Sequence, residues 1–364
     1  MAVGLVVLLA PAGLAAQSGV LSPAYESVVR RYAAGDRQGA VANLADWPEG
    51  RLRDEFTALR ALVQASLACP GGCGAANVWQ RIPIEAALML HSDAAQEVRG
   101  EGRLPRLHES AAVEIARLMK QDPSRRTFAR RWYEAMAGLA QGENRWGEAL
   151  EWAERGLEDY PDSAGMHLVL GSIEETLGAR LGFREIEEAE VGVNAGRARS
   201  EIVYRHEIRA HLERAERALR SAVAADPSLV EALLRLGRVC WRLGETTEAR
   251  SFLQDVLDRK PERETALLAH LFLGRLDEDA GRLDEATQAY EAALALDPSA
   301  QAARIALSHV RLRRGDTASA RAEAETALGF SGYRLRQDPF WLYPWGPSVG
   351  VEERLEALRR EASS

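Results

Sequence analysis

The second half of the chain repeats itself with a fixed period. Pro227 and Pro261 are separated by 34 positions (261 minus 227), and Gly281 and Gly315 are separated by the same number. Each unit holds an apolar stretch, a glycine turn, a second stretch that begins near an alanine, and a final proline. A helix–turn–helix unit of this length cannot bury its apolar stripe alone, so neighbouring units must stack to complete a core. The period therefore predicts an all-α chain of stacked helix pairs.

Two units carry the repeat most fully. They share a leucine and a glycine in the first helix, an alanine in the second helix and a closing proline. The residues are Leu236, Gly237, Ala249 and Pro261 in one unit, and Leu273, Gly274, Ala286, Tyr290 and Pro298 in the next. This pattern resembles the tetratricopeptide repeat family. The resemblance implies a right-handed α-solenoid, in which Gly274 and Ala286 are small because two helices cross there.

The pattern divides the chain into four predicted regions. A long insertion interrupts one unit, and we expect it to form a loop followed by an N-terminal extension of that unit's second helix. The regions are a signal peptide at residues 1–17, a divergent helical region at 21–123, the repeat array at 124–332 with its insertion at 179–210, and an aromatic strap with a capping helix at 333–364.

The N-terminal run MAVGLVVLLAPAGLAAQSG is apolar, and no charge precedes Glu26. Such a run followed by small residues is typical of a secretory signal, with cleavage near Ala16. A buried first helix is the alternative, but Pro11 and Gly13 would interrupt it. The usual basic residues are missing before the run, which leaves open a start upstream of Met1. We expect an exported protein, periplasmic or extracellular, with no membrane span in its mature form because no other stretch is long and apolar enough.

Export gives meaning to two cysteines. Cys69 and Cys73 lie in the stretch ACPGGCG, whose proline and glycines can fold tightly enough to bring the two sulfurs together. A disulfide and a pair of free thiols are both open. Cys240 occupies a core slot of the repeat and is predicted to be a buried small side chain.

The stretch HEIRAH is one residue longer than a zinc peptidase signature. His206 and His211 are five positions apart, which places them about 140° apart around a helix, whereas the signature needs a spacing of four. A longer His-Glu-x-x-x-His form exists in dipeptidyl-peptidase III-like metallopeptidases, so a zinc enzyme that uses His206, Glu207 and His211 is the alternative. The further acidic segment of that family is missing downstream. We therefore predict no catalytic residue, no metal and no cofactor, and we interpret His91 and His108 as packed or half-exposed side chains and not as ligands.

The stretch DPFWLYPWGPS near the end concentrates aromatic residues: Phe340, Trp341, Tyr343 and Trp345. Pro339, Pro344 and Pro347 argue against a helix, so we expect an extended strap. A strap that covers the exposed apolar face of the last repeat is the favoured interpretation, because solenoids need such caps. A motif that docks a partner is the alternative.

The resemblance also implies a binding groove lined by the first helices. Its positions correspond here to Arg238, Trp241 and Arg242 in one unit, Arg275 in the next, and His309 and Arg313 in the third. Arg238, Arg275 and His309 are expected to form a polar ladder for an acidic or C-terminal peptide, unless they form only a solvated face. The net charge of -8 argues against a nucleic-acid partner. The sequence therefore predicts an exported, non-catalytic scaffold for a protein or peptide partner.

Overall fold

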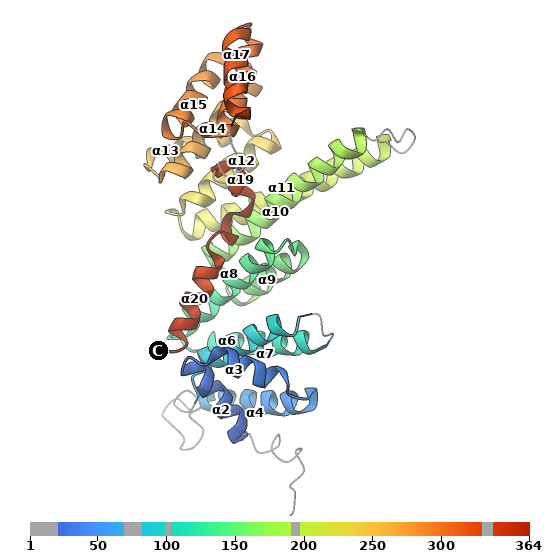
Figure 1. The fold of residues 1–364 in the computed structure, drawn as a ribbon, viewed down its shortest axis with the longest axis vertical. Coiled ribbons are helices and arrows are strands. Elements are labelled where there is room, and N and C mark those ends of the chain that lie inside the picture. Colours follow the sequence, from blue (N-terminus) through green and yellow to red (C-terminus); the bar gives the residue numbers. More distant parts are fainter. Residues whose placement is uncertain (1–20, 69–81, 100–102, 191–196, 330–337) are drawn as a thin grey trace, which may run out of the picture. The chain divides into compact units, whose positions relative to one another are not determined.

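The structure of the chain is a computed structural model that describes residues 21–68, 82–99, 103–190, 197–329 and 338–364 (Figure 1). Every regular element in these ranges is a helix, and no strand occurs among them. The predicted all-α class is confirmed. None of the helices described has both the length and the apolar content that crossing a bilayer requires.

Two compact units make up the chain. The first, called the N-terminal unit, comprises Met1–Trp132 and Glu352–Ser364, and the second, called the repeat unit, comprises Tyr133–Val351. Helices α8 (Arg126–Gly142) and α20 (Val351–Glu361) cross the divisions between them. The other helices of the N-terminal unit are α2 (Pro23–Ala33), α3 (Arg37–Ala45), α4 (Glu49–Ala68), α6 (Ile84–Glu97) and α7 (Arg103–Met119).

The core of the N-terminal unit contains a chain of buried hydrogen bonds. The Tyr25 hydroxyl lies 2.9 Å from His91 Nε2, and His91 Nδ1 lies 3.1 Å from His108 Nδ1. Burial lowers the pKa of His91 to about 3, with the neighbouring His108 adding to the effect, and burial lowers the pKa of His108 to about 4. Both imidazoles are therefore neutral near pH 7. The interpretation of these histidines as packed side chains is confirmed.

Helix α20 closes the N-terminal unit. Its Leu355 and Leu358 are buried, as their helical spacing predicts. Arg359 binds Asp93 at 2.9 Å, and Glu356 accepts a hydrogen bond from Arg37 at 2.8 Å. The last helix of the chain thus completes the core to which the first helices belong.

The repeat unit is a solenoid of helix pairs. Helices α10–α11, α12–α13, α14–α15 and α16–α17 form successive hairpins, and each hairpin packs against the next. The first helices of neighbouring hairpins also contact one another, and we call the surface that α10, α12, α14 and α16 form the inner face. The helices are α9 (Trp146–Asp159), α10 (Ala164–Glu190), α11 (Arg197–Ala225), α12 (Val230–Leu243), α13 (Thr246–Asp258), α14 (Arg263–Asp279), α15 (Leu283–Leu296), α16 (Gln301–Arg313) and α17 (Thr317–Leu328), followed by α19 (Pro339–Leu342) and the 3₁₀ helix η3 (Tyr343–Ser348).

Small residues set the distance between paired helices. A side chain at Gly237 would place its first carbon 2.8 Å from Cγ of Leu253, and one at Gly274 would collide with the ring of Tyr290. Ala249 and Ala286 are fully buried at the same crossings. The glycine that follows α12, α14 and α16 has another cause, because it adopts a positive φ (90° at Gly244) that favours glycine.

The insertion differs from the prediction. We expected a loop followed by a lengthened second helix, but α10 continues without interruption to Glu190 and α11 begins at Arg197. Both helices of the hairpin are therefore extended, and Figure 1 shows them running side by side as an arm. We expected the loop to begin near Gly182, but a glycine inside a helix costs only about 1 kcal/mol and does not by itself end the helix.

We predict that Gly274→Ala lowers the free energy of unfolding by about 1–3 kcal/mol, because the new methyl group must displace the buried Tyr290 ring. Chemical denaturation of the full chain measures the change. The matched control is Gly147→Ala in α9, where a methyl group meets nothing within 4 Å and should raise helix stability by up to about 1 kcal/mol. Equal effects of the two substitutions would contradict the crossing argument.

Candidate functional site: the inner face of the repeat unit

The chain's own residues 338–349, called the C-terminal segment, lie on the inner face. Helix α19 contacts α14, and η3 contacts α10. The expectation that prolines exclude a helix here is wrong. Pro339 begins α19 behind an N-cap, Asp338, whose carboxylate accepts from the backbone N–H of Phe340 at 2.9 Å, and Pro344 lies at the start of η3. Proline is compatible with the first turn of a helix because the N–H that it lacks has no partner there.

The described part of the C-terminal segment covers the last repeat in part. Leu312 and Leu328 of that repeat stay 55% and 79% exposed. Among the described residues, the beginning of the segment meets the last repeat: Asp338 Oδ2 accepts from the backbone N–H of Ala302 at 3.0 Å, and Phe340 packs on the apolar cluster of α14, α15 and α16. It then follows the inner face toward α10.

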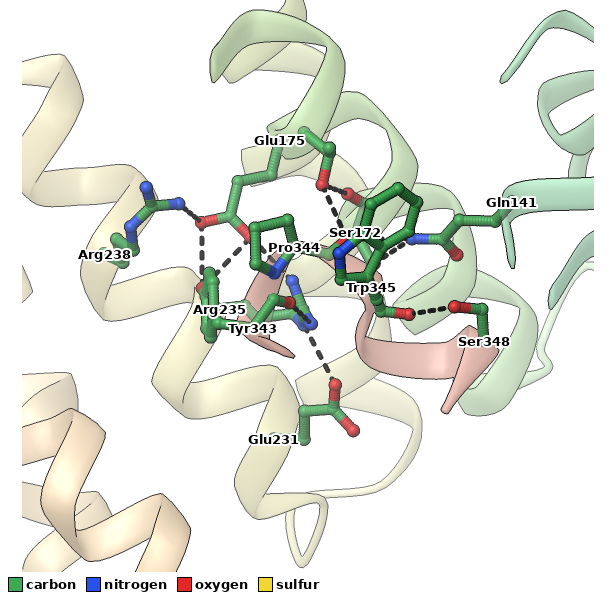
Figure 2. A network of polar contacts seen from close by, with 11 residues as sticks. Gln141, Ser172, Glu175, Glu231, Arg235, Arg238, Tyr343, Pro344, Trp345 and Ser348 are labelled. Carbon is green, nitrogen blue, oxygen red and sulfur yellow. Dashed lines mark hydrogen bonds and ion pairs between the residues drawn. The ribbon is translucent and has the colours of Figure 1, made fainter. Parts of the chain in front are cut away.

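A buried carboxylate on α10 holds the C-terminal segment. Glu175 is 1% exposed and accepts from the Tyr343 hydroxyl at 2.8 Å, from Arg235 at 2.9 Å and from Arg238 at 2.5 Å (Figure 2). Tyr343 comes from the segment and the two arginines from α12. One side chain of α10 thus joins its own hairpin to the next hairpin and to the segment.

Arg235 is the second centre of the network. Its guanidinium is 1% exposed and donates to Glu175, to Glu231 Oε1 at 3.0 Å and to the backbone carbonyl of Tyr343 at 2.9 Å. The same guanidinium stacks over the Tyr343 ring, 4.4 Å from its centroid. Gly346 is glycine for a steric reason, because any side chain there would collide with Arg235.

Two further contacts fix the middle of the segment. The Pro344 carbonyl accepts from Gln141 Nε2 and from the Thr176 hydroxyl, both at 3.1 Å. The Trp345 ring lies 5.7 Å from that of Trp146. Figure 2 shows Gln141 and Trp345 on the side of the network away from Arg238.

Electrostatics keep Glu175 ionised despite its burial. Burial alone would raise the pKa of Glu175, but the charges of Arg238 and Arg235 and their hydrogen bonds outweigh burial and lower it. Charge-assisted hydrogen bonds of this kind are each worth about 1.5–3 kcal/mol. Removal of one partner of a buried pair is strongly destabilising because it leaves an uncompensated charge.

The sequence reasoning missed the centre of this network, namely Glu175, Arg235 and Tyr343. The family positions pointed to Arg238 and passed over Arg235, three residues earlier. The available signal for Arg235 was a charge inside the apolar run LLRLG, whereas the mixed stretch SIEETLG gave no comparable signal for Glu175. A charged side chain that helical periodicity places in a core must find a partner.

The predicted groove residues lie in several different environments. Arg238 belongs to the Glu175 network, whereas Arg275, His309 and Arg313 surround Glu278, a buried carboxylate of α14. Glu278 also accepts from the Tyr290 hydroxyl at 2.8 Å. Trp241 Nε1 donates to Asp279 at 2.8 Å. Arg238, Arg275 and His309 thus each meet a carboxylate of the chain itself, and their role in binding stays a prediction.

A family model matches this part of the chain. The model described as "Tetratricopeptide repeat" covers residues 209–264 and 272–339, which contain the crossings of Gly237 and Gly274 and most of the stacked hairpins. This part of the chain, about a third of it, consists of tetratricopeptide repeats.

Several solved structures are similar to this repeat protein. The crystal structure of MamA is 17% identical, with 56% of this chain and 95% of that chain covered and a TM-score of 0.38. MamA 41-end from Desulfovibrio magneticus RS-1 is 16% identical, with coverages of 57% and 96% and a TM-score of 0.41. YrrB, described as a TPR protein with an unusual peptide-binding site, is 15% identical, with coverages of 61% and 90% and a TM-score of 0.36. No curated protein matches the chain.

The histidines of the HEIRAH stretch do not converge in the repeat protein. His211 Nδ1 lies 2.5 Å from the buried Glu174 of α10, and Arg214 donates to the same carboxylate at 2.7 Å. His206 is exposed one and a half turns earlier on α11. These contacts explain His211 as part of the packing between α10 and α11. Among the described residues, the three side chains that approach metal-binding geometry are instead Glu216, Cys240 and Glu245, where Arg220 already binds Glu216.

The cysteine predictions have different outcomes. Cys240 is fully buried, as its core slot predicted. Burial raises the pKa of its thiol to about 12, so the thiol is protonated at neutral pH. Cys69 and Cys73 lie outside the described residues, and their disulfide stays a prediction.

We predict that Glu175→Gln lowers the free energy of unfolding by about 3–5 kcal/mol at pH 7, because it removes the buried carboxylate that both Arg235 and Arg238 bind and leaves the buried Arg235 with the half-exposed Glu231 as its counter-charge. The lowered pKa of Glu175 sets the pH dependence. Its contribution is complete above the ordinary glutamate pKa of 4.5 and is lost as the pH falls through the lower value of the folded state. The difference in unfolding free energy between the variant and the wild type should therefore narrow only when the pH falls below 4.5.

Glu231→Gln is the matched control, because Glu231 binds the same Arg235 but is 43% exposed. Water can replace its interaction, so we expect a loss of at most about 1 kcal/mol. Denaturant titrations of both variants at several pH values make the comparison. An equal loss for Glu175→Gln and Glu231→Gln would show that burial of the charge is not what matters.

Proposed function

We propose that this repeat protein is a non-catalytic scaffold that binds a polypeptide partner on the part of the inner face beyond the C-terminal segment. The observation that supports the proposal is the exposure of α16 on that side. Ile305, His309 and Leu312 are exposed and follow the spacing of one helix stripe. His309 reaches the buried Glu278 of α14, so this stripe borders the inner face. Exposed apolar side chains near Arg275 and Arg313, which lie around the same Glu278, suit a peptide that is both apolar and acidic.

The C-terminal segment is a fixed part of this face in the proposal. Its displacement would break the bonds of Tyr343 to Glu175 and Arg235, worth about 1.5–3 kcal/mol each, and would expose a buried aromatic ring worth about 1.5–3 kcal/mol. A peptide with micromolar affinity releases about 8 kcal/mol on binding. Displacement would consume more than half of that free energy, so the partner is better accommodated beside the segment.

The alternative of a zinc peptidase finds no support in the geometry of HEIRAH. His211 is held by Glu174 and Arg214, and His206 points from another part of the helix surface. Stacked helix pairs with an exposed inner stripe favour binding over catalysis.

We further propose that the scaffold acts outside the cytoplasm. The support is the sequence of residues 1–17 alone, which lies outside the described residues. The expected result is a protein isolated from its native source that begins close to Gln17, because the signal is removed near Ala16. Intact-mass measurement with N-terminal sequencing decides the matter, and a purified protein that retains the apolar run would contradict export.

Selection of peptides from a random library on the immobilised full chain tests the binding proposal. We predict that the selected peptides are enriched in acidic and apolar residues, and that they bind the double variant Arg275→Ala, His309→Ala at least about tenfold more weakly, since each charge-assisted contact contributes about 1.5–3 kcal/mol. Fluorescence anisotropy gives the dissociation constants.

The matched control is the double variant Arg209→Ala, Arg321→Ala, which removes two exposed arginines from the second helices α11 and α17. It should bind the same peptides as tightly as the wild type. Thermal unfolding of all variants checks that the fold is intact. Peptides that bind both double variants equally well would place the partner elsewhere.

A further inference from the structure

Two buried histidines of the N-terminal unit face each other, and we call His91 of α6 and His108 of α7 the histidine pair. His91 is 2% exposed and His108 is 0% exposed. Their Nδ1 atoms lie 3.1 Å apart, and His91 Nε2 lies 2.9 Å from the hydroxyl of Tyr25 on α2. The remaining nitrogen, Nε2 of His108, is buried with no hydrogen-bond partner among the described residues.

The contacts of the histidine pair suit two neutral imidazoles. A neutral imidazole carries one N–H group and one bare nitrogen that accepts. When His108 Nδ1 donates to His91 Nδ1, and His91 Nε2 donates to the Tyr25 oxygen, both N–H groups have acceptors. His108 Nε2 then carries no hydrogen, so the pair buries no unpaired donor.

A third proton does not fit this arrangement. A gap of 3.1 Å between two nitrogens holds one hydrogen, so a third proton leaves an N–H group on each Nε2. The N–H of His108 Nε2 has no acceptor among the described residues. The pair also gains a positive charge at a site that water does not reach. A buried charge and a buried unpaired donor are both unfavourable.

Charged groups on the helices around the histidine pair bind partners other than the pair. They are Arg37 of α3 with Glu356 of α20, Glu55 of α4 with the backbone N–H of Ser22, Glu85 of α6 with Arg125, Asp93 of α6 with Tyr32 and Arg359, and Glu114 of α7 with Arg60. Burial is the main cause that lowers the pKa of both histidines, and the neighbouring His108 lowers the pKa of His91 further. A proton on the pair therefore finds no counter-charge.

The histidines of the repeat unit are placed differently. His211 Nδ1 lies 2.5 Å from the carboxylate of Glu174, and His309 binds Glu278, so a proton gained at either histidine meets a carboxylate. The others are exposed or half-buried, namely His167, His206 and His270. Burial lowers the pKa of His270 as well, but this side chain keeps part of its surface in water. Acid therefore acts mainly on the N-terminal unit.

We propose that the histidine pair and Tyr25 form an acid-sensitive switch that opens the N-terminal unit while the repeat unit stays folded. The pair must reach water before it can take up protons, so acid favours the open form. Helix α20 belongs to the same core through Leu355 and Leu358, and its Arg359 binds Asp93 on the helix of His91. Opening therefore releases the last helix of the chain. The switch does not depend on the binding function proposed above.

The direction of the pH dependence follows from the lowered pKa values. In the open form the two histidines take up protons around the ordinary pKa of 6.5, whereas in the folded form their pKa values are about 3 and about 4. Their contribution to stability is complete above pH 6.5 and is lost as the pH falls from 6.5 toward 4. Two protons taken up on opening raise the open population about a hundredfold between pH 7.5 and about pH 5.5.

Hydrogen exchange of the full chain, followed by mass spectrometry, measures the opening of each unit separately. Division by the intrinsic exchange rate at each pH gives the protection factor of each segment. We expect the amides of α2, α6 and α7 to lose about a hundredfold in protection between pH 7.5 and about pH 5.5, and those of α12 and α13 to lose at most about tenfold.

His108→Phe and His91→Gln each remove one titrating group, so each should reduce the loss in the N-terminal unit to about tenfold. This ratio between two pH values does not depend on the baseline stability of a variant, and the second variant decides if the first does not fold. The control His206→Gln removes an exposed histidine of α11 and should keep the hundredfold loss. Three results would each overturn the proposal: an equal loss in both units, a loss that neither variant of the pair reduces, or a loss that begins only below about pH 4.5, where carboxylates titrate.

Discussion

The ionised carboxylate of Glu175 is the constraint on which the repeat unit depends. It is buried, so it needs positive charge within hydrogen-bonding distance, and Arg235 and Arg238 of the next hairpin supply it. The hydroxyl of Tyr343 adds a third donor. Ordinary stacking of helix pairs is apolar and tolerates small shifts. This network admits one register between α10 and α12, and it admits one position for the C-terminal segment.

The stacked hairpins could be predicted from the sequence because their causes are local. The 34-residue period recurs from unit to unit. The small residue at a crossing and the glycine after α12, α14 or α16 each shape the helix pair to which they belong. Gly237, Gly274 and the buried Ala286 lie where the repeat pattern places them. The exposed stripe of α16 could also be anticipated in part, since the repeat pattern already singled out His309.

The centre of the site could not be predicted because its contacts join distant parts of the chain. Tyr343 and Glu175 are 168 residues apart, and no local pattern pairs them. The prolines of the segment misled for a physical reason, because proline forbids the interior of a helix but not its first turn. The expected loop in the insertion was wrong for another reason. The packing of α10 against α11 stabilises the long helix by more than the glycine inside it destabilises it. Arg242 was identified as a groove residue. No local pattern predicts that the packing around it buries Nη1 without an acceptor among the described residues.

Residues 338–361 complete both units. The C-terminal segment lies on the repeat unit, and α20 belongs to the core of the N-terminal unit. During synthesis these residues leave the ribosome after the helices that they contact. Until then Glu175 and Arg235 lack Tyr343, and Asp93 lacks Arg359. Neither unit can reach its final structure before residues 338–361 have been made, so their synthesis sets the earliest time at which both units can finish folding.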